Sequence, residues 1–147
     1  MEFPVDDAKA VAEFANRGIG FERGGKYYVD VLQAAYLTEI GKCNYPRAVE
    51  KANSDDFLRK RYLVFRDLRG KMHVANYIAK DDVFLVYEKG MVPKHAESKY
   101  MLKLLENASL DELIAFRRQA LSLRKDFIIA CVAGENVEYY KFGEIQM

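Results

Sequence analysis

The stretch SLDELIAFRRQALSLRKDFIIACV, from Ser109 to Val132, joins an amphipathic segment to a continuous apolar run. Ser109 and Glu112 have the S-x-x-E spacing of a capping box, in which the serine oxygen accepts a hydrogen bond from a backbone N–H at the start of a helix. The apolar spacing that follows predicts a helix over Leu110–Leu123. The run Phe127–Val132 is too apolar for an edge strand, so we expect a central strand covered by a helix.

The remainder of the chain beyond Gly70 has the same mixed character. Runs rich in β-branched and aromatic residues predict further strands at Met72–Ile78, Val83–Tyr87, Lys99–Leu105 and Val137–Phe142. The run Lys99–Leu105 is also apolar enough for the centre of a sheet. We therefore expect an α/β (α+β) domain with a mixed sheet in this half of the chain.

The amino-terminal part predicts a smaller αβ domain. Apolar spacing predicts helices over Asp6–Gly18 and Asp30–Gly41, with Asp30 as N-cap and Gly41 as the stop. A short strand is expected between them at Gly24–Asp30.

The two parts are expected to meet near Asn53. Pro46 and the segment ANSDD mark a joint, and Ser54 is expected to cap a longer helix that ends at Gly70. The apolar stripe of that helix consists of Leu58, Tyr62, Phe65 and Leu68. The predicted organisation is a small domain at residues 1–53 and a larger one at residues 54–147.

Composition narrows the class of protein. A chain of 147 residues, half of them apolar, buries one sizeable core, or one core plus a small appendage. No apolar run reaches about eighteen residues and the first ten residues are acidic, so we expect neither a membrane span nor a signal peptide, and a cytoplasmic location. Cys43 and Cys131 lie far apart, and the apolar setting of Cys131 predicts a buried free thiol and no metal site.

Charge is nearly balanced. With 23 basic and 22 acidic residues, a nucleic-acid role must depend on local patches. Two groups of cations are candidates for facing phosphates, although solvated helix faces produce such runs as well: Arg117, Arg118, Arg124 and Lys125, and Arg59, Lys60, Arg61, Arg66 and Arg69.

Several segments occur in an order and spacing that resemble the archaeal tRNA-splicing endonuclease, which excises introns from precursor tRNA. They are VLQAAYLTEIG, RYLVFRDLRG, FLVYEKG, KYMLKLL, the stretch Ser109–Val132, and VEYYKF. The most specific pieces are VYEKG and SLRKDFIIACV, and the resemblance covers roughly Gly18 to the carboxyl terminus. It implies a small amino-terminal αβ domain joined to a carboxyl-terminal nuclease-type domain, and assembly as a four-domain complex.

The resemblance also implies a chemistry. In that family cleavage needs no metal or other cofactor and uses a tyrosine, a histidine and a lysine. The ribose 2′-hydroxyl must lose a proton, the leaving 5′-oxygen must gain one, and negative charge develops on the phosphorane oxygens. By resemblance Tyr87 matches the base and Lys125 matches the cation.

The histidine position admits two alignments. If SKYMLKLL is the strand after the tyrosine, Ser98 is the small residue that follows the slot and Glu97 occupies the slot itself. If His95 is placed there, two extra residues must be accommodated before the strand. We prefer the first alignment, which leaves the acid missing; His73, in a strand-like run, is expected to be structural.

A second departure concerns the loop before the tyrosine strand. Catalytic members of the family carry a glycine there, whereas NYIAKDDV has none and is expected to place Asp81 and Asp82 where they repel a phosphate. The amino-terminal domain also looks short. The resemblance therefore favours the structural chain of a two-plus-two heterotetramer with a catalytic endonuclease subunit, acting on precursor tRNA.

By resemblance the carboxyl-terminal hairpin takes part in assembly. Val137, Tyr139 and Tyr140 would pair tail to tail across a two-fold interface, while Glu135 and Glu138 belong to an acidic loop that enters a groove of the opposing dimer. The alternative is an ordinary polar hairpin, since residues 133–136 make a good turn in any case.

Two other functions stay open at this stage. The chain is a catalytic subunit if Tyr87, His95 and Lys125 act together, or a homodimeric α/β binding module unrelated to RNA. Each residue also has an ordinary structural interpretation: a half-buried strand tyrosine, a solvated loop histidine, and a lysine that offsets a helix dipole.

Overall fold

The computed structural model describes residues 1–142, and the chain divides into two compact units, Met1–Asp67 and residues from Leu68 onward. The division between residues 67 and 68 falls inside the helix α4 (Asp56–Gly70), which is continuous across it. The boundary predicted from the sequence, between residues 53 and 54, lies at the end of the preceding helix α3 (Pro46–Ser54) and stays a prediction about domain organisation.

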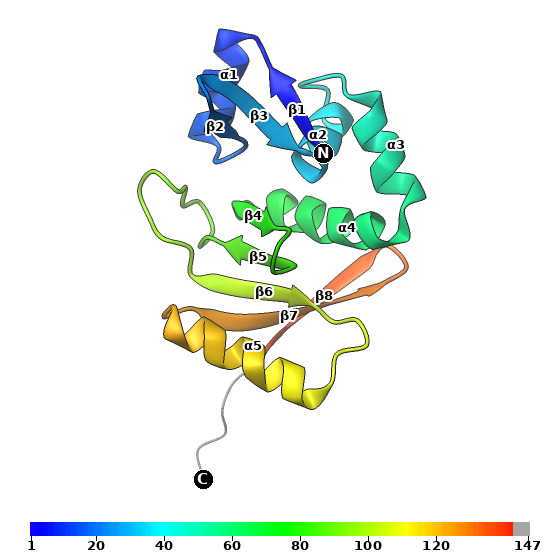
Figure 1. Ribbon diagram of the computed structural model, residues 1–147, viewed down its shortest axis with the longest axis vertical. Coiled ribbons are helices and arrows are strands. Elements are labelled where there is room, and N and C mark those ends of the chain that lie inside the picture. Colours follow the sequence, from blue (N-terminus) through cyan, green and yellow to red (C-terminus); the bar gives the residue numbers. More distant parts are fainter. Residues whose placement is uncertain (143–147) are drawn as a thin grey trace. The chain divides into compact units, whose positions relative to one another are not determined.

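The amino-terminal unit contains a small antiparallel sheet and helices (Figure 1). Its strands run in the order β1-β3-β2, and its elements before α3 are β1 (Glu2–Val5), α1 (Ala8–Asn16), β2 (Phe21–Arg23), β3 (Lys26–Asp30) and α2 (Val31–Glu39). Buried side chains include Phe14, Val29, Leu32 and Leu37. The predicted αβ character is confirmed, and the two short strands β1 and β2 were not predicted because neither has an alternating pattern long enough to detect.

The start and stop signals of α2 act as the sequence predicts. Asp30 accepts a hydrogen bond from the Gln33 N–H at 2.8 Å, and the Gln33 side chain accepts one from the Asp30 N–H at 2.9 Å. Gly41 follows the helix with φ +80°, a conformation that favours glycine. The protein around the Asp30 carboxyl group dehydrates it and raises its pKa to about 6, although part of the residue remains exposed.

The joint predicted around Pro46 is a helix. Pro46 is the first residue of α3, a position where proline fits because its missing N–H has no intrahelical partner to lose. The prediction that Ser54 caps the next helix is wrong, because Ser54 ends α3. The cap is Asp55, whose carboxylate accepts a hydrogen bond from the Leu58 N–H at 3.2 Å.

The carboxyl-terminal unit is a five-stranded mixed sheet in the order β4-β5-β6-β7-β8. The strands are β4 (Ala75–Ile78), β5 (Val83–Val86), β6 (Tyr100–Leu104), β7 (Asp126–Ala133) and β8 (Asn136–Lys141). Only the pair β6 and β7 is parallel among these strands; the other neighbours are antiparallel. The predicted mixed sheet is confirmed, and both of the most apolar runs form interior strands.

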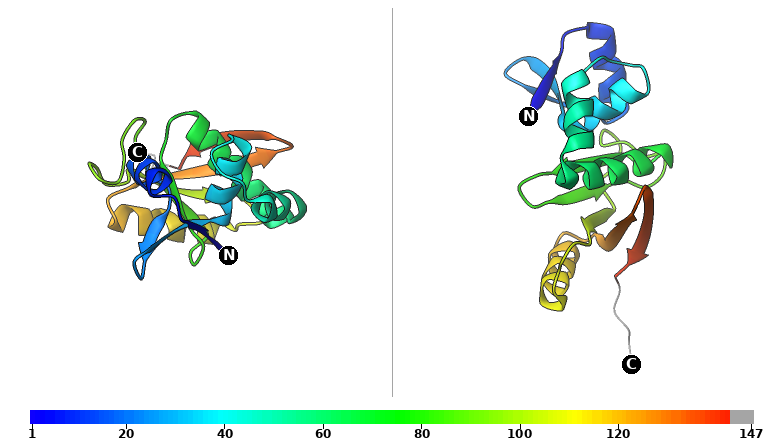
Figure 2. Two further views of the ribbon diagram at one scale, coloured as in Figure 1. Left: turned by 90° about the horizontal axis from the view of Figure 1, so that it is seen from above. Right: turned by 90° about the vertical axis from the view of Figure 1, so that its right-hand side faces the viewer.

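The helix α5 (Leu110–Ser122) makes the crossover between the two parallel strands and lies on one face of the sheet (Figure 2). Ser109 Oγ accepts a hydrogen bond from the Glu112 N–H at 3.1 Å, so the predicted cap is confirmed. Ala120 of the helix packs with Met101, Phe127 and other apolar residues of the sheet. This packing fixes the position of the segment that leads from α5 into β7.

Two negative features of the described residues complete the fold. Within residues 1–142, no helix is both long enough and apolar enough to cross a membrane. In the same residues, no three acidic, histidine or cysteine side chains gather in a way that suits a metal ion. Cys43 and Cys131 are free thiols, each partly buried.

Candidate functional site

The sheet register brings three chain segments together at one edge. Val86 at the end of β5 pairs with Tyr100 at the start of β6, which pairs with Asp126 at the start of β7. Just beyond the strands, the Lys99 N–H donates to the Val86 carbonyl at 2.9 Å and the Asp126 N–H donates to the Lys99 carbonyl at 3.0 Å. Tyr87 and Lys125 lie next to these bonds, so both lie where β5, β6 and β7 begin or end. This line of strand ends is called the Tyr87 edge of the sheet.

Lys125 is held in place from both ends. Arg124 ends the helical segment with φ +58°, and the Lys125 N–H then donates to the Ala120 carbonyl at 2.8 Å. At the other end of the side chain, Nζ donates to the Ser98 carbonyl at 2.7 Å. This partner is a neutral carbonyl and supplies no counter-charge to the ammonium group.

Tyr87 is half-buried, and its pKa is raised above the usual value of a tyrosine. Burial is the larger cause and the negative charge of Glu97 is the second. A general base of this type must give up its own proton first, so both influences make its reactive form scarcer at neutral pH. The environment of Tyr87 therefore works against the role that the family resemblance implies.

The loop between β5 and β6 carries both candidates for the histidine position. Glu97 is exposed and close enough to Tyr87 to influence its ionisation. His95 is also exposed and lies in a turn, where its N–H donates to the Val92 carbonyl at 3.0 Å. The electrostatic influence of Glu97 on the pKa of Tyr87 is consistent with the alignment that puts Glu97 in the slot.

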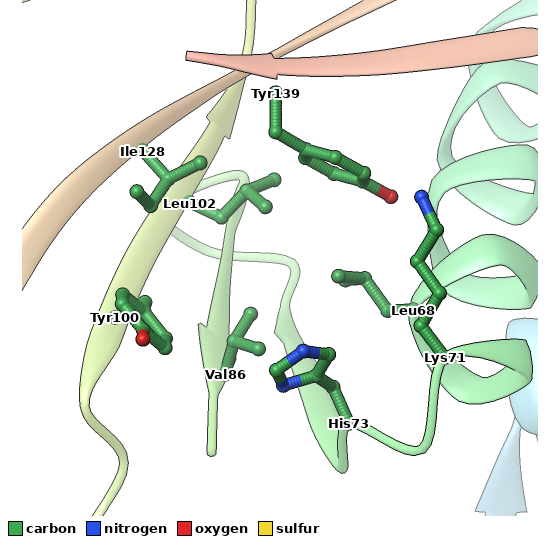
Figure 3. Close-up of a pocket in the computed structure, with 8 residues that line it drawn as sticks. All are labelled: Leu68, Lys71, His73, Val86, Tyr100, Leu102, Ile128 and Tyr139. Carbon is green, nitrogen blue, oxygen red and sulfur yellow. The ribbon is translucent and has the colours of Figure 1, made fainter. Parts of the chain in front are cut away.

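His73 lies beside the backbone of Tyr87. Its Nδ1 is 2.7 Å from the Tyr87 carbonyl oxygen, while the Tyr87 N–H donates to the Val74 carbonyl at 2.9 Å. The imidazole thus joins β4 to the end of β5, as a structural histidine does, and it also lines a cavity (Figure 3). Sequence reasoning missed this cavity, because its residues come from four strands, from α4 and from the segment that follows α4.

The expected position of Asp81 and Asp82 is wrong. They occupy the turn between β4 and β5, where Ile78 pairs with Val83, so they lie at the opposite edge of the sheet from Tyr87. The five residue-to-residue steps of extended chain from Asp82 to Tyr87 span about 17 Å. These carboxylates do not repel a phosphate at Tyr87, and the absence of glycine in their loop says nothing about that edge.

The arginines of the predicted RNA-binding group are distributed unevenly. Arg117 lines a cavity of about 300 Å³ together with Lys125 and Lys141, and Asp126 lies 3.7 Å from the Lys141 ammonium group. Three cations and one carboxylate therefore surround this cavity. Arg118 and Arg124 are exposed, on α5 and in the turn after it.

The predicted assembly residues lie on the β7–β8 hairpin. Glu135 is exposed in the turn, with Ala133 and Asn136 paired on either side. Tyr140 donates a hydrogen bond to the exposed Glu138 at 2.6 Å. Because β8 is the last strand in the order of the sheet, one of its backbone edges faces away from its neighbour β7.

The other two assembly residues, Val137 and Tyr139, lie on the opposite face of β8 from Tyr140, because neighbouring strand residues alternate between faces. The Tyr139 ring lies 5.0 Å from the Lys71 ammonium group, and it lines the same cavity as His73.

Comparisons with known proteins agree with this arrangement. The sequence model of a family described as "tRNA intron endonuclease, catalytic C-terminal domain" matches residues 58–139. A protein of Methanopyrus kandleri named tRNA-splicing endonuclease is 32% identical over 147 aligned positions, covering 89% of this chain and 79% of its own. Proteins with the same name are 30% identical in Methanothermobacter thermautotrophicus (86% of this chain, 85% of the relative) and Pyrococcus abyssi (90% and 85%).

These matches extend beyond the carboxyl-terminal unit. An alignment over 89% or 90% of the chain must include most of the amino-terminal unit as well as the sheet that carries Tyr87 and Lys125. On the family match and on the identity and coverage of its archaeal relatives, the chain belongs to the tRNA-splicing endonuclease family.

Proposed function

We propose that the chain is a cytoplasmic, structural subunit of a tRNA-splicing endonuclease that excises introns from precursor tRNA at bulge-helix-bulge sites. It assembles with a catalytic subunit as a two-plus-two heterotetramer. The names of the archaeal relatives support the RNA-processing role, and family membership argues against a binding module unrelated to RNA.

The observation that carries the structural role is the surroundings of Tyr87. A carboxylate, Glu97, lies close enough to raise its pKa, and at neutral pH an ionised carboxylate has no proton to give to the leaving 5′-oxygen. The same charge opposes the approach of a phosphate. Among residues 1–142, the tyrosine and the lysine of the family pattern are both present at this edge, and the carboxylate that acts on Tyr87 supports the absence of the acid.

A catalytic subunit is the second candidate, and one observation favours it. Tyr87 and Lys125 lie at the same sheet edge, and His95 belongs to the loop at that edge. A rearranged loop that brings His95 to the reacting phosphate would complete the set. RNA would then be cleaved without metal to 2′,3′-cyclic phosphate and 5′-hydroxyl ends.

The deciding experiment compares the purified chain alone with its mixture with a catalytic family member, on bulge-helix-bulge RNA in the presence of EDTA. We expect no cleavage by the chain alone and cleavage by the mixture above the level of the catalytic member alone. Efficient cleavage by the lone chain rules out the structural role.

A single substitution sharpens the result. Glu97→His supplies an acid at the slot and removes the charge that raises the pKa of Tyr87. We expect it to give the lone chain measurable cleavage, and Glu97→Gln, which removes only the charge, to give none. If His95→Ala abolishes an activity that the unmodified chain already has, the catalytic alternative is correct.

Assembly is tested at the hairpin turn. Glu135 is exposed there, and a carboxylate that enters a basic groove of an opposing dimer forms charge-assisted hydrogen bonds. Glu135→Lys is expected to shift tetramers toward dimers on light scattering, while Glu50→Lys, an exposed charge reversal on α3, leaves them intact. Tetramers that persist in the Glu135 variant at low concentration and high salt contradict the docking role.

A further inference from the structure

A cavity of about 260 Å³ opens on one face of the five-stranded sheet (Figure 3). It is lined by Leu68, Lys71, His73, Val86, Tyr100, Leu102, Ile128 and Tyr139. Three strands supply the aliphatic side chains of Val86, Leu102 and Ile128, which form a flat apolar floor. The polar residues stand around this floor, as the close-up shows.

The cavity is distinct from the edge site that contains Tyr87 and Lys125. Val86, the last residue of β5, lines the cavity, whereas Tyr87, which follows the strand, and Lys125 are not among its lining residues. The face opposite the cavity carries α5, with Met101 and Phe127 packed against it. The two sites are nevertheless joined, because His73 contacts the backbone carbonyl of Tyr87 at 2.7 Å.

The polar groups of the cavity offer both kinds of hydrogen-bonding partner. A carbonyl oxygen only accepts, so the contact with Tyr87 requires His73 Nδ1 to carry a hydrogen, and Nε2 of the neutral ring is then an acceptor. Figure 3 shows the His73 ring directed into the cavity and the Lys71 ammonium group beside Tyr139. Lys71 Nζ, 5.0 Å from the Tyr139 ring, is a donor and a positive charge.

We propose that this cavity holds one unpaired nucleobase of a bound RNA, a site that rests on the proposed RNA-processing function. A volume near 260 Å³ is below the usual range for drug-sized ligands and suits one small planar ring system. The tyrosine rings and the aliphatic floor pack against the faces of the base. At the edge of the base, His73 accepts a hydrogen bond and Lys71 donates one. Lys71 also attracts the adjoining phosphate.

The tail-to-tail contact that the family resemblance implies for Tyr139 is the competing use of this cavity, but an apolar side chain of a partner subunit fits it less well. It would cover the floor but leave His73 Nε2 without a hydrogen-bond donor in a space from which water is displaced, which is unfavourable. A base satisfies this nitrogen. Bulges supply bases that are unpaired before binding, so little pairing energy is lost when one of them enters.

The test uses the full-length chain and bulge-helix-bulge RNA in which 2-aminopurine replaces one bulge nucleotide at a time. At one position, binding is expected to change the emission, because the base stacks against the tyrosine rings. Tyr139→Ala is expected to abolish that change and to weaken binding about fivefold or more, the scale of one lost base–aromatic contact. Phe21→Ala is the control, since it removes an exposed aromatic ring of the amino-terminal unit that lies outside the cavity.

A second variant keeps the test decisive if Tyr139→Ala perturbs the sheet. Lys71→Met retains an apolar stem at an exposed position and is expected to weaken binding and reduce the emission change at the same bulge position. If the RNA binds and neither variant alters the response at any position, the base site is wrong while the proposed function stands. If adding a catalytic subunit, and not RNA, shields Tyr139, the cavity is a protein interface and the inference is also wrong. If the unmodified chain, alone and in the assembled complex, binds no RNA, both proposals fail.

Discussion

Two opposite ends of the same sheet each carry a lysine and a tyrosine, but these residues have different partners at the two ends. At the β4–β5 turn, Lys103 lies near Asp82 and Tyr77. At the opposite edge, Lys125 lies against a backbone carbonyl and Tyr87 lies near Glu97. Since both pairs belong to the same sheet, their residue types alone do not tell a structural cluster from a functional one.

The Lys103 cluster is complete within the chain. The Lys103 side chain is 15% exposed. Its Nζ lies 3.5 Å from an Asp82 carboxylate oxygen and donates to the Asp82 carbonyl at 3.1 Å. Tyr77 donates to the other carboxylate oxygen at 2.6 Å, and the ammonium group lies 4.4 Å from the centre of the Phe116 ring. Each charge has its counter-charge, so the cluster needs no ligand.

The Lys125 edge is different because its cation is positioned by a neutral group. The Ser98 carbonyl orients the ammonium group without neutralising it. The comparison teaches that the partner of a charged group, more than its burial or its residue type, separates a charge that stabilises the fold from one that is available to a ligand. The following predictions test this distinction.

The largest effect is expected at Lys103. Lys103→Met keeps the apolar stem but leaves the Asp82 carboxylate without its cation, and breaking such a pair costs about 2 to 3 kcal/mol once partial exposure is allowed for. The free energy of unfolding, measured with urea, checks this value. Lys99→Met, which breaks the exposed pair with Glu88, is the control and is expected to leave stability unchanged within error.

The next effect is a pH dependence in the amino-terminal unit. The folded-state pKa of Asp30 is raised to about 6, from 3.8 for an ordinary aspartate. A raised carboxyl pKa stabilises the fold below the unfolded pKa, and this contribution is lost as the pH rises through the folded pKa. Between pH 5 and pH 7.5 the loss amounts to about 1.4 kcal/mol.

Asp30→Asn removes this titration and keeps an oxygen that accepts the Gln33 N–H. We expect the stability of the unmodified chain to fall relative to this variant as the pH rises from 5 to 7.5, as followed by urea unfolding at each pH. A difference that does not change with pH would mean that the Asp30 carboxyl group is hydrated. If the expected fall is observed, Asp30 provides a reference for a titratable structural group that the protein dehydrates.

Prediction from sequence succeeded where a local signal is sufficient. The S-x-x-E spacing at Ser109 identifies a helix start, and the apolar runs identify the interior strands, because capping and burial depend on neighbouring residues. The cap at Asp55 was misassigned by one residue, since serine and aspartate are equally suitable and only the end of α3 decides between them.

The site was harder to predict because it depends on register. The sequence gives no measure of which strand end faces which loop, so Asp81 and Asp82 were placed at the wrong edge. The neighbourhood of Tyr87 and Glu97 was anticipated only through the family alignment. The cavity around His73 has no signal in the chain, since its residues share no spacing or motif.

A smaller effect is expected at Glu97. Burial is the main cause of the raised pKa of Tyr87 and the charge of Glu97 is the second, so Glu97→Gln is expected to lower this pKa only partway toward the usual value. Titration of Tyr87 by NMR measures the shift. Glu88→Gln, which changes a nearby exposed carboxylate, is the control, and an equal shift in both variants would mean that Glu97 has no special position.

The smallest effect is expected at the two residues that most resemble a catalytic pair. If the chain is structural, Tyr87→Phe and Lys125→Met leave the single-turnover rate of the assembled complex within about twofold, because neither group takes part in proton transfer. Saturating enzyme is required, so that weaker assembly is not mistaken for slower chemistry.

The two substitutions differ in how far they disturb the fold, and this difference makes the measured rates interpretable. Tyr87→Phe removes only a hydroxyl from a half-buried ring, so the fold is expected to persist. Lys125→Met removes the donor to the Ser98 carbonyl, and a hydrogen bond from a charged donor contributes about 1.5 to 3 kcal/mol. A slower rate in Lys125→Met alone therefore points to a loosened edge. A loss of about a hundredfold or more in both variants is the effect of removing a general base in one and a cation that stabilises the phosphorane in the other, and it would assign catalysis to this chain.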